Sequence, residues 1–163
     1  MIVRVLALAG GLAAGGVTSQ FPKFSQQYVQ RLGGAVDALE QVVADFDASA
    51  AAVGLSRSEA LAQMQGTDFL DRRRADMSRT IDRYDRLRAD LADVQNAGPF
   101  MRAYHASALT DNEVGRATME AFAPAVPLTP AGAIFAGTGF LAGLMAVWAV
   151  LRLMLWPLRR RPA

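Results

Sequence analysis

Few residues of this chain could perform catalysis or hold a metal. It has one histidine, His105, and no cysteine, which excludes thiol catalysis, thiolate metal sites and disulfides. No histidine or carboxylate stands four residues from His105, so the spacing of a helical metal site is missing. A serine triad would need His105, and no Gly-x-Ser-x-Gly elbow is present. We expect His105 to be a surface or packing residue, in a protein that is not an enzyme and has no cofactor, metal or catalytic residue.

The acidic side chains also argue against catalysis. All 15 lie between Asp37 and Glu120, and residues 71–93 alternate aspartate with arginine. Arginine neighbours keep carboxylates ionised and do not raise their pKa for acid catalysis. We expect this face to be solvated; the alternative is a site for an acidic partner or a lipid headgroup, centred on residues 72–74.

Basic residues are divided between the chain ends and the middle. Five of the 17 lie at the ends, which leaves 12 in the middle against all 15 acidic residues. The end residues are Arg4, Arg152, Arg159, Arg160 and Arg161. Because the middle is mildly acidic, we exclude nucleic acid as a partner.

An uncharged run of 21 residues, Ala131–Leu151, lies near the end of the chain. At about 1.5 Å per residue, such a helix matches a hydrocarbon core of about 30 Å. Thr129 and Pro130 suit its start, and Trp156 suits the interface at its end. We predict a transmembrane helix here.

A second apolar segment follows Arg4 and continues to Phe24. Its length and small residues also fit a secretory signal cleaved after Ala9 or Ala14. We favour an uncleaved anchor. The positive-inside rule then places Arg4 and the terminal arginines, residues 159–161, in the cytoplasm.

The predicted fold is therefore all-α, a membrane-anchored helical hairpin or small bundle with two transmembrane helices and both termini inside. We divide it into a first span (1–22), an exported helical domain (23–128), a second span (129–156) and a basic cytoplasmic tail (157–163). The expected location is a bacterial inner membrane, with the central domain in the periplasm.

The spacing of apolar residues predicts amphipathic helices in the exported part. The spacing of its apolar residues predicts a long helix from Ser25 to Val53, with the seam Tyr28, Leu32, Ala35, Leu39, Val42, Phe46, Ser49 and Val53. A second long helix is expected after Thr67 or Asp68, with the inner face Leu70, Met77, Ile81, Tyr84, Leu87, Leu91 and Val94. The segments 56–59 and 110–113 have the form of capping boxes. The two long helices can pair antiparallel, although the first could equally pair with another copy of the chain.

Small residues recur at four-residue spacing in both spans. These are Gly11 and Gly15, Gly132 and Ala136, and Gly139 and Gly143. Such spacing lets helices approach closely in lipid. The two spans could pack together through them, or they could form a docking face for another membrane protein.

Aromatic residues and prolines mark the two places where the chain leaves and re-enters the membrane. They are Phe21, Pro22, Phe24, Tyr28, Phe122, Pro124 and Pro127. We expect an interfacial collar in which Phe21, Phe24 and Phe122 pack together. The alternative is an epitope for a partner.

Two blocks of the sequence are distinctive: SQFPKFSQQYVQRLGG from Ser19 to Gly34, and FAPAVPLTP from Phe122 to Pro130. They resemble an uncharacterised proteobacterial family of short two-span inner-membrane proteins, a domain of unknown function. The resemblance implies an inner-membrane protein with an exported helical part. It supplies no catalytic residues.

Three functions remain open. We favour an accessory, structural or scaffold subunit that packs against a larger membrane-protein assembly or against itself. A periplasmic ligand-binding or sensor bundle is the alternative, although few residues follow the second span to carry an output. An envelope enzyme would require a buried carboxylate near His105.

Overall fold

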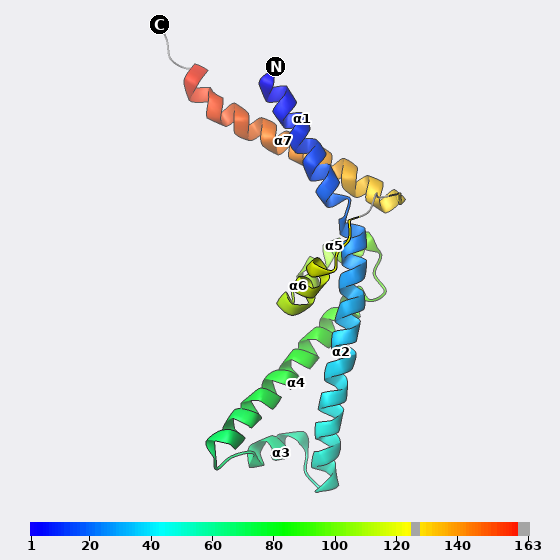
Figure 1. Cartoon of the computed structure of the whole chain (residues 1–163), viewed down its shortest axis with the longest axis vertical. Helices are drawn as coiled ribbons and strands as arrows, with labels where there is room; N and C mark the ends of the chain where they lie inside the picture. The colour runs from blue at the N-terminus through cyan, green and yellow to red at the C-terminus, as the bar shows by residue number, and fades with distance from the viewer. Residues whose placement is uncertain (125–127, 160–163) are drawn as a thin grey trace. The chain divides into compact units, whose positions relative to one another are not determined.

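The computed structural model describes residues 1–124 and 128–159, with side chains through Met154 in the last helix. Every regular element of these residues is helical, which confirms the all-α class (Figure 1). The elements are α1 (Ile2–Thr18), α2 (Phe21–Ala52), α3 (Arg57–Gln63), α4 (Asp68–Val94), α5 (Pro99–Tyr104), the 3-10 helix η1 (Ala106–Leu109), α6 (Asn112–Glu120) and α7 (Pro130–Arg159).

The chain forms two compact units. The membrane unit combines Met1–Gln26 with Phe122–Ala163, and the helical unit is Gln27–Ala121. The predicted membrane boundaries at 22 and 129 lie close to these divisions and stay predictions.

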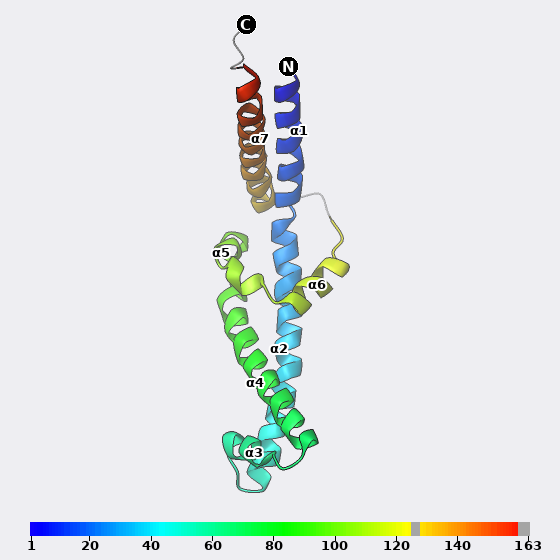
Figure 2. The ribbon, with the colours of Figure 1, turned by 90° about the vertical axis from the view of Figure 1, so that its left-hand side faces the viewer.

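Helices α1 and α7 pack antiparallel in the membrane unit (Figure 2). Two helical stretches of the described residues, Ile2–Ala52 and Pro130–Met154, each contain a segment long and apolar enough to cross a membrane. The outward faces of α1 and α7 carry exposed Leu12, Val17, Leu141 and Met145. This is the distribution expected of a helix pair surrounded by lipid.

Two residues, Ser19 and Gln20, separate α1 from α2. Ser19 follows α1, and its hydroxyl donates to the Gly16 carbonyl at 2.6 Å. Pro22, in the first turn of α2, has no N–H with which to continue the α1 ladder. The interruption between α1 and α2 therefore coincides with the donor that Pro22 lacks.

In the helical unit, α4 runs back alongside α2 (Figures 1 and 2). Its buried residues are Met77, Ile81, Tyr84, Leu87 and Val94, all on the predicted inner face. Thr67 caps α4, and its hydroxyl accepts from the Leu70 N–H at 3.3 Å. The predicted start and inner face of this helix are confirmed.

The predicted seam of α2 is correct only in its first turns. Tyr28 and Leu32 are fully buried, but Val42 and Val53 are 43% and 70% exposed. The residues buried further along are Val36, Val43 and Ala50. Val36, Val43 and Ala50 recur every seven residues, which is the 3.5-residue period that the prediction assumed, but each lies one residue after the predicted seam position.

The segment between α2 and α4 turns twice. Gly54 and Gly66 have φ values of +75° and +101°, which side chains with a Cβ rarely adopt. Between them lies α3, and its predicted capping box is present. The Ser56 hydroxyl accepts from the Glu59 N–H, and the Glu59 carboxylate accepts from the Ser56 N–H at 2.8 Å.

Candidate functional site

Glycine residues allow α1 and α7 to approach at backbone distance. A Cβ added at Gly11 would lie 2.9 Å from the Phe140 carbonyl oxygen, and one at Gly15 would lie 2.8 Å from the Ala136 carbonyl oxygen. These distances leave no room for a side chain. The predicted small residues therefore lie where one helix contacts the other.

The same relationship holds for the glycines of α7. A Cβ at Gly139 would overlap the Thr18 side chain, whose own Cβ would be 2.8 Å away. A Cβ at Gly143 would lie 2.5 Å from the Ala14 Cβ and 2.9 Å from the Gly10 carbonyl oxygen. Packing of the two spans against each other thus accounts for Gly139 and Gly143. Docking of another protein on these residues stays a prediction.

A hydrogen bond joins the two helices beside this contact. The Thr18 hydroxyl lies 2.8 Å from the Phe135 carbonyl oxygen and 2.9 Å from the Ala14 carbonyl oxygen of its own helix. At the start of α7, buried Gly132 donates its N–H to the Thr129 hydroxyl at 3.1 Å. Gly132 therefore lies in the N-terminal cap of α7.

The aromatic collar consists of two ring pairs. Phe24 and Phe122 contact edge to face with ring centroids 5.8 Å apart. Phe21 pairs with Phe135, 5.2 Å away, a residue that the sequence analysis placed in the second span. Beside the Phe24–Phe122 pair, the Lys23 Nζ donates a hydrogen bond to the Ala123 carbonyl at 2.7 Å. This bond joins the two chain segments that carry these rings.

The other predicted collar residues have different surroundings. Pro22 is half-buried, and its carbonyl accepts a 3.0 Å hydrogen bond from the Ser25 hydroxyl. Pro124 is exposed, and Pro127 lies outside the described residues. Tyr28 belongs to the helical unit and is fully buried there.

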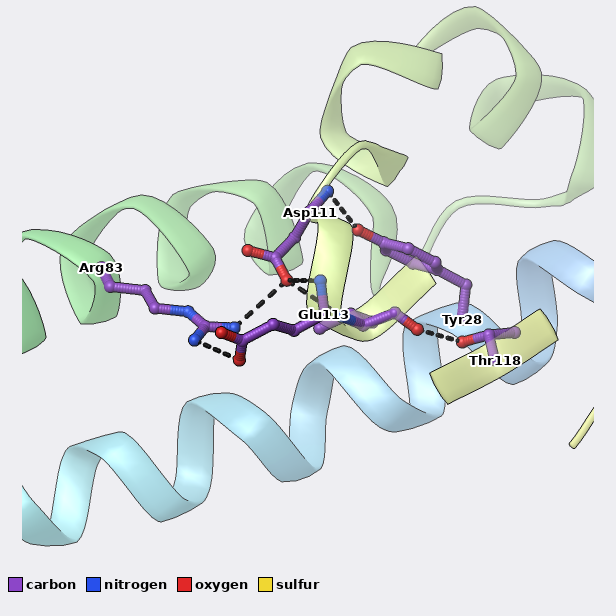
Figure 3. A network of polar contacts seen from close by, with 6 residues as sticks. Tyr28, Arg83, Asp111, Glu113 and Thr118 are labelled. Carbon is purple, nitrogen blue, oxygen red and sulfur yellow. Dashed lines mark hydrogen bonds and ion pairs between the residues drawn. The ribbon is translucent and has the colours of Figure 1, made fainter. Parts of the chain in front are cut away.

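Tyr28 takes part in a polar network that joins three helices of the helical unit (Figure 3). The Asp111 N–H donates to the Tyr28 hydroxyl at 2.9 Å. The Asp111 carboxylate caps α6 by accepting from the N–H groups of Glu113 and Val114 at 3.1 and 3.0 Å. Arg83 of α4 pairs with the same carboxylate at 3.2 Å and also with Glu113. The network therefore connects α2, α4 and the start of α6.

Burial sets the electrostatics of this network. Desolvation raises the pKa of Tyr28 above its usual value. The hydrogen bond to Glu113 raises the pKa of Arg83, with the Asp111 charge as a further cause. The Arg83 Nε is buried without a hydrogen-bond partner among the described residues. The network is suited to holding α6 in place, and neither side chain has a pKa suited to proton transfer near neutral pH.

A crevice of about 560 Å³ lies at the other end of the helical unit, between α2, α3 and α4. It is lined by Asp47, Ser56, Arg57, Ser58, Leu61, Ser78, Ile81 and Asp82. Arg57 donates to both Asp47 carboxylate oxygens, at 2.7 and 2.5 Å, and thereby connects α3 to α2. The Arg57 hydrogen bond also holds the pKa of Asp47 below its usual range.

The charged face of α4 forms local ion pairs. Arg74 pairs with Asp71 at 3.3 Å, and Arg79 pairs with Asp76. The two residues of each pair are three positions apart on α4. Arg72 and Arg73 are exposed, and binding of an acidic partner there stays a prediction.

The arginines from which the topology was predicted lie near the ends of α1 and α7, and their role in topology stays a prediction. Arg4 is exposed in the first turn of α1. Arg152, also exposed, stacks on the Trp148 ring at 4.9 Å. Arg159 is the last residue of α7, while its side chain and the whole of Arg160 and Arg161 lie outside the described part.

His105 follows α5, and its ring contacts Tyr104 edge to face with centroids 5.2 Å apart. Within residues 1–124 and 128–159, no group of three or more histidine or carboxylate residues is placed to hold a metal. This arrangement assigns no chemistry to His105, and the expectation that the protein is not an enzyme stays a prediction.

Comparison with known proteins gives a family and no further relatives. No curated protein and no solved structure matches the chain. One family model, described as a protein of unknown function, matches residues 2–160, which is nearly the whole sequence. The chain therefore belongs to the uncharacterised family DUF2937.

Proposed function

We propose that this protein is a two-span protein of a bacterial inner membrane, with both termini in the cytoplasm and residues 27–121 in the periplasm. The support is the apolar, uncharged α1–α7 pair with arginines at the ends that carry the termini. Arg152 stacked on Trp148 suits an interface, where the aromatic ring and the cation both reach headgroup level.

Within that membrane, we propose that the protein acts as a non-enzymatic accessory or scaffold subunit beside another integral membrane protein. The observation that carries this proposal is the division of glycines between two faces of α7. Gly139 and Gly143 face α1, but a Cβ at Gly137 would meet nothing within 4 Å. Gly137, exposed beside Leu141, leaves a shallow surface on which a partner helix could lie closely.

The test is solubilisation in mild detergent at native expression level, followed by size separation and mass spectrometry. We expect a stoichiometric membrane-protein partner, lost in Gly137→Leu and retained in Ala142→Leu, which introduces the same side chain at another exposed position of α7. A protein that migrates alone, or a partner retained in Gly137→Leu, would contradict this docking face. Migration as a homo-oligomer that Gly137→Leu dissociates would make the partner a second copy.

A second function, binding of a small polar ligand, is favoured by the crevice between α2, α3 and α4. Its hydroxyl groups, carboxylates and guanidinium lie beside the apolar Leu61 and Ile81. Such a mixture suits a ligand with both hydroxyl groups and an apolar face. A thermal-shift screen of the full chain with sugars and amino acids tests this function. We expect a shift that is lost in Ser78→Leu but kept in Ser49→Leu; no shift at millimolar concentration would contradict it.

A further inference from the structure

The guanidinium of Arg57, in the lining of the crevice between α2, α3 and α4, keeps hydrogen-bond donors in reserve. Its Nε and Nη2 donate to the two carboxylate oxygens of Asp47, in the side-on arrangement of an arginine–carboxylate pair. Among the described residues, no acceptor bonds to its Nη1. Because the guanidinium is a planar fork, its end-on edge, formed by Nη1 and Nη2, can bind a second carboxylate while Asp47 keeps the first edge. The Arg57 side chain is 39% exposed, so a solute can reach it.

The α4 side of the same crevice carries a carboxylate that is not used in the fold. Asp82 is exposed, and its carboxylate forms no ion pair or hydrogen bond within the part of the chain that the structure describes. Ser78 precedes it by one helical turn on the same side of α4 and also lines the crevice. One turn of α4 therefore presents an anion and a hydroxyl group to the crevice, and α3 presents a cation (Figure 1 shows the three helices).

Apolar side chains complete the lining of the crevice. Leu61 of α3 is half-buried, and Ile81 of α4 is buried. The crevice volume of about 560 Å³ lies within the range of about 300–1,000 Å³ that is typical of small-molecule sites. The crevice therefore has room for a ligand that combines charged groups with an apolar side chain.

Opposite charges on two helices favour a ligand that carries both charges. A ligand with only a carboxylate would be attracted by Arg57 but repelled by Asp82, and a ligand with only an ammonium group would meet the reverse. Hydrogen bonds between ionised groups are about twice as strong as those between neutral groups, so an uncharged ligand such as a sugar would gain less from both residues. A zwitterion satisfies Arg57 and Asp82 together.

We propose that the crevice binds a zwitterionic amino compound, with its carboxylate on the end-on edge of Arg57 and its ammonium group on Asp82. The apolar side chain of the ligand lies against Leu61 and Ile81. A free amino acid and a short peptide share this chemistry. The proposal rests on the proposed second function, the binding of a small polar ligand in this crevice, and names the class of that ligand. It requires neither the membrane topology nor the partner protein.

Calorimetric titration of the detergent-solubilised full chain tests this assignment. The probes are L-leucine and the dipeptide L-leucyl-L-leucine. Each is compared with its amide, which lacks the carboxylate, and with its N-acetyl derivative, which lacks the ammonium group. We expect at least one probe to bind about 10-fold or more tightly than both of its derivatives. Binding of leucine alone would identify a free amino acid as the ligand, and binding of the dipeptide alone would identify a peptide.

Two substitutions test the two charged contacts separately. Asp82→Asn should lower the affinity for the zwitterion about 10-fold and leave that for the N-acetyl derivative unchanged. Asp76→Asn removes a carboxylate of α4 that does not line this crevice, so as the control it should change neither affinity. Arg57→Gln should lower the affinity for the zwitterion by a similar factor and leave that for the amide unchanged. Release of α3 from α2 would weaken both ligands alike, so equal losses in Arg57→Gln would overturn the contact with the carboxylate.

The outcomes separate this proposal from the proposed ligand binding on which it rests. If neither probe binds more tightly than its derivatives, but a sugar gives a thermal shift that Ser78→Leu abolishes, the crevice remains a ligand site and the zwitterion assignment is overturned. If no sugar, amino acid or dipeptide binds at millimolar concentration, both proposals are overturned together.

Discussion

The hydroxyl group of Tyr28 accepts a 2.9 Å hydrogen bond from the backbone N–H of Asp111, 83 residues later in the chain. Tyr28 is completely buried, so its ring fills space between α2 and α6 while its hydroxyl satisfies a backbone donor. This contact connects the first helix of the helical unit to the last one.

Removal of the Tyr28 hydroxyl should weaken that connection. We expect Tyr28→Phe to lower the free energy of unfolding by about 1 kcal/mol, because the Asp111 N–H loses its partner and the ring is retained. Denaturation of the detergent-solubilised chain, followed by circular dichroism, measures the change. Tyr104→Phe alters an exposed hydroxyl and should change stability by less than about 0.5 kcal/mol; equal effects of the two variants would contradict the account.

The raised pKa of Tyr28 predicts a dependence of stability on alkaline pH. Below the usual tyrosine pKa of about 10, both the folded and the unfolded state keep the proton. As pH rises above that value, the unfolded state loses the proton first, so Tyr28 contributes a stability that is lost toward its raised pKa. We expect the wild type to lose more stability than Tyr28→Phe between about pH 9 and 11. Parallel curves for the two proteins would contradict burial of this hydroxyl.

The Asp111 carboxylate combines a helix cap with an ion pair, and two substitutions separate these roles. Asp111→Asn keeps an oxygen that can cap α6 and loses the charge that faces Arg83. Asp111→Ala loses both, so we expect it to cost about 2 kcal/mol, roughly 1 kcal/mol more than Asp111→Asn. Unfolding curves of the three proteins check the order.

Close packing of the membrane helices predicts opposite outcomes at two neighbouring glycines of α7. Gly139→Ala places a methyl group on Thr18 and should destabilise the helix pair by about 1–3 kcal/mol. Gly137→Ala adds the same methyl group where nothing lies within 4 Å, and should be neutral or slightly stabilising. The measurement is thermal unfolding in detergent, followed by tryptophan fluorescence. The prediction fails if both variants melt alike.

The ion pair between Asp47 of α2 and Arg57 of α3 predicts how firmly α3 is held against α2. Loss of the pair in Asp47→Asn should speed tryptic cleavage after Arg57 about 2–5-fold, because no residue of α3 is buried to hold the helix otherwise. Asp71→Asn, which removes a pair within α4, is the control and should leave this cleavage unchanged. Unchanged cleavage in Asp47→Asn would show that α3 is held by other contacts.

Local patterns allowed much of the fold to be predicted. The inner face of α4 and the caps at Ser56 and Thr67 follow from spacing and residue type within one helix, and the structure has all three. The predicted N-cap of α6 lies one residue before the observed one. The sequence pattern favoured Thr110, but Asp111 is the N-cap, and its carboxylate also reaches Arg83.

Contacts between distant segments could not be predicted. Tyr28 was expected in the interfacial collar because its sequence neighbours are aromatic, and nothing near it in the sequence indicates Asp111 as a partner. Phe135 was likewise assigned to the span, because its pairing with Phe21 depends on how α1 and α7 align. Four-residue spacing identified Gly139 as a close-packing site. Only the structure shows the contact with Thr18, which leaves no room for a side chain at position 139.

The central claim is that α1 and α7 span the membrane and hold residues 27–121 on its outer side. Labelling of single-cysteine variants with a membrane-impermeant maleimide in intact spheroplasts tests it most directly. We predict that Ser49→Cys is labelled before lysis and that Leu12→Cys, on the outward face of α1, is not labelled without detergent. Labelling of Ser49→Cys only after lysis, or of Leu12→Cys in intact spheroplasts, would contradict this topology.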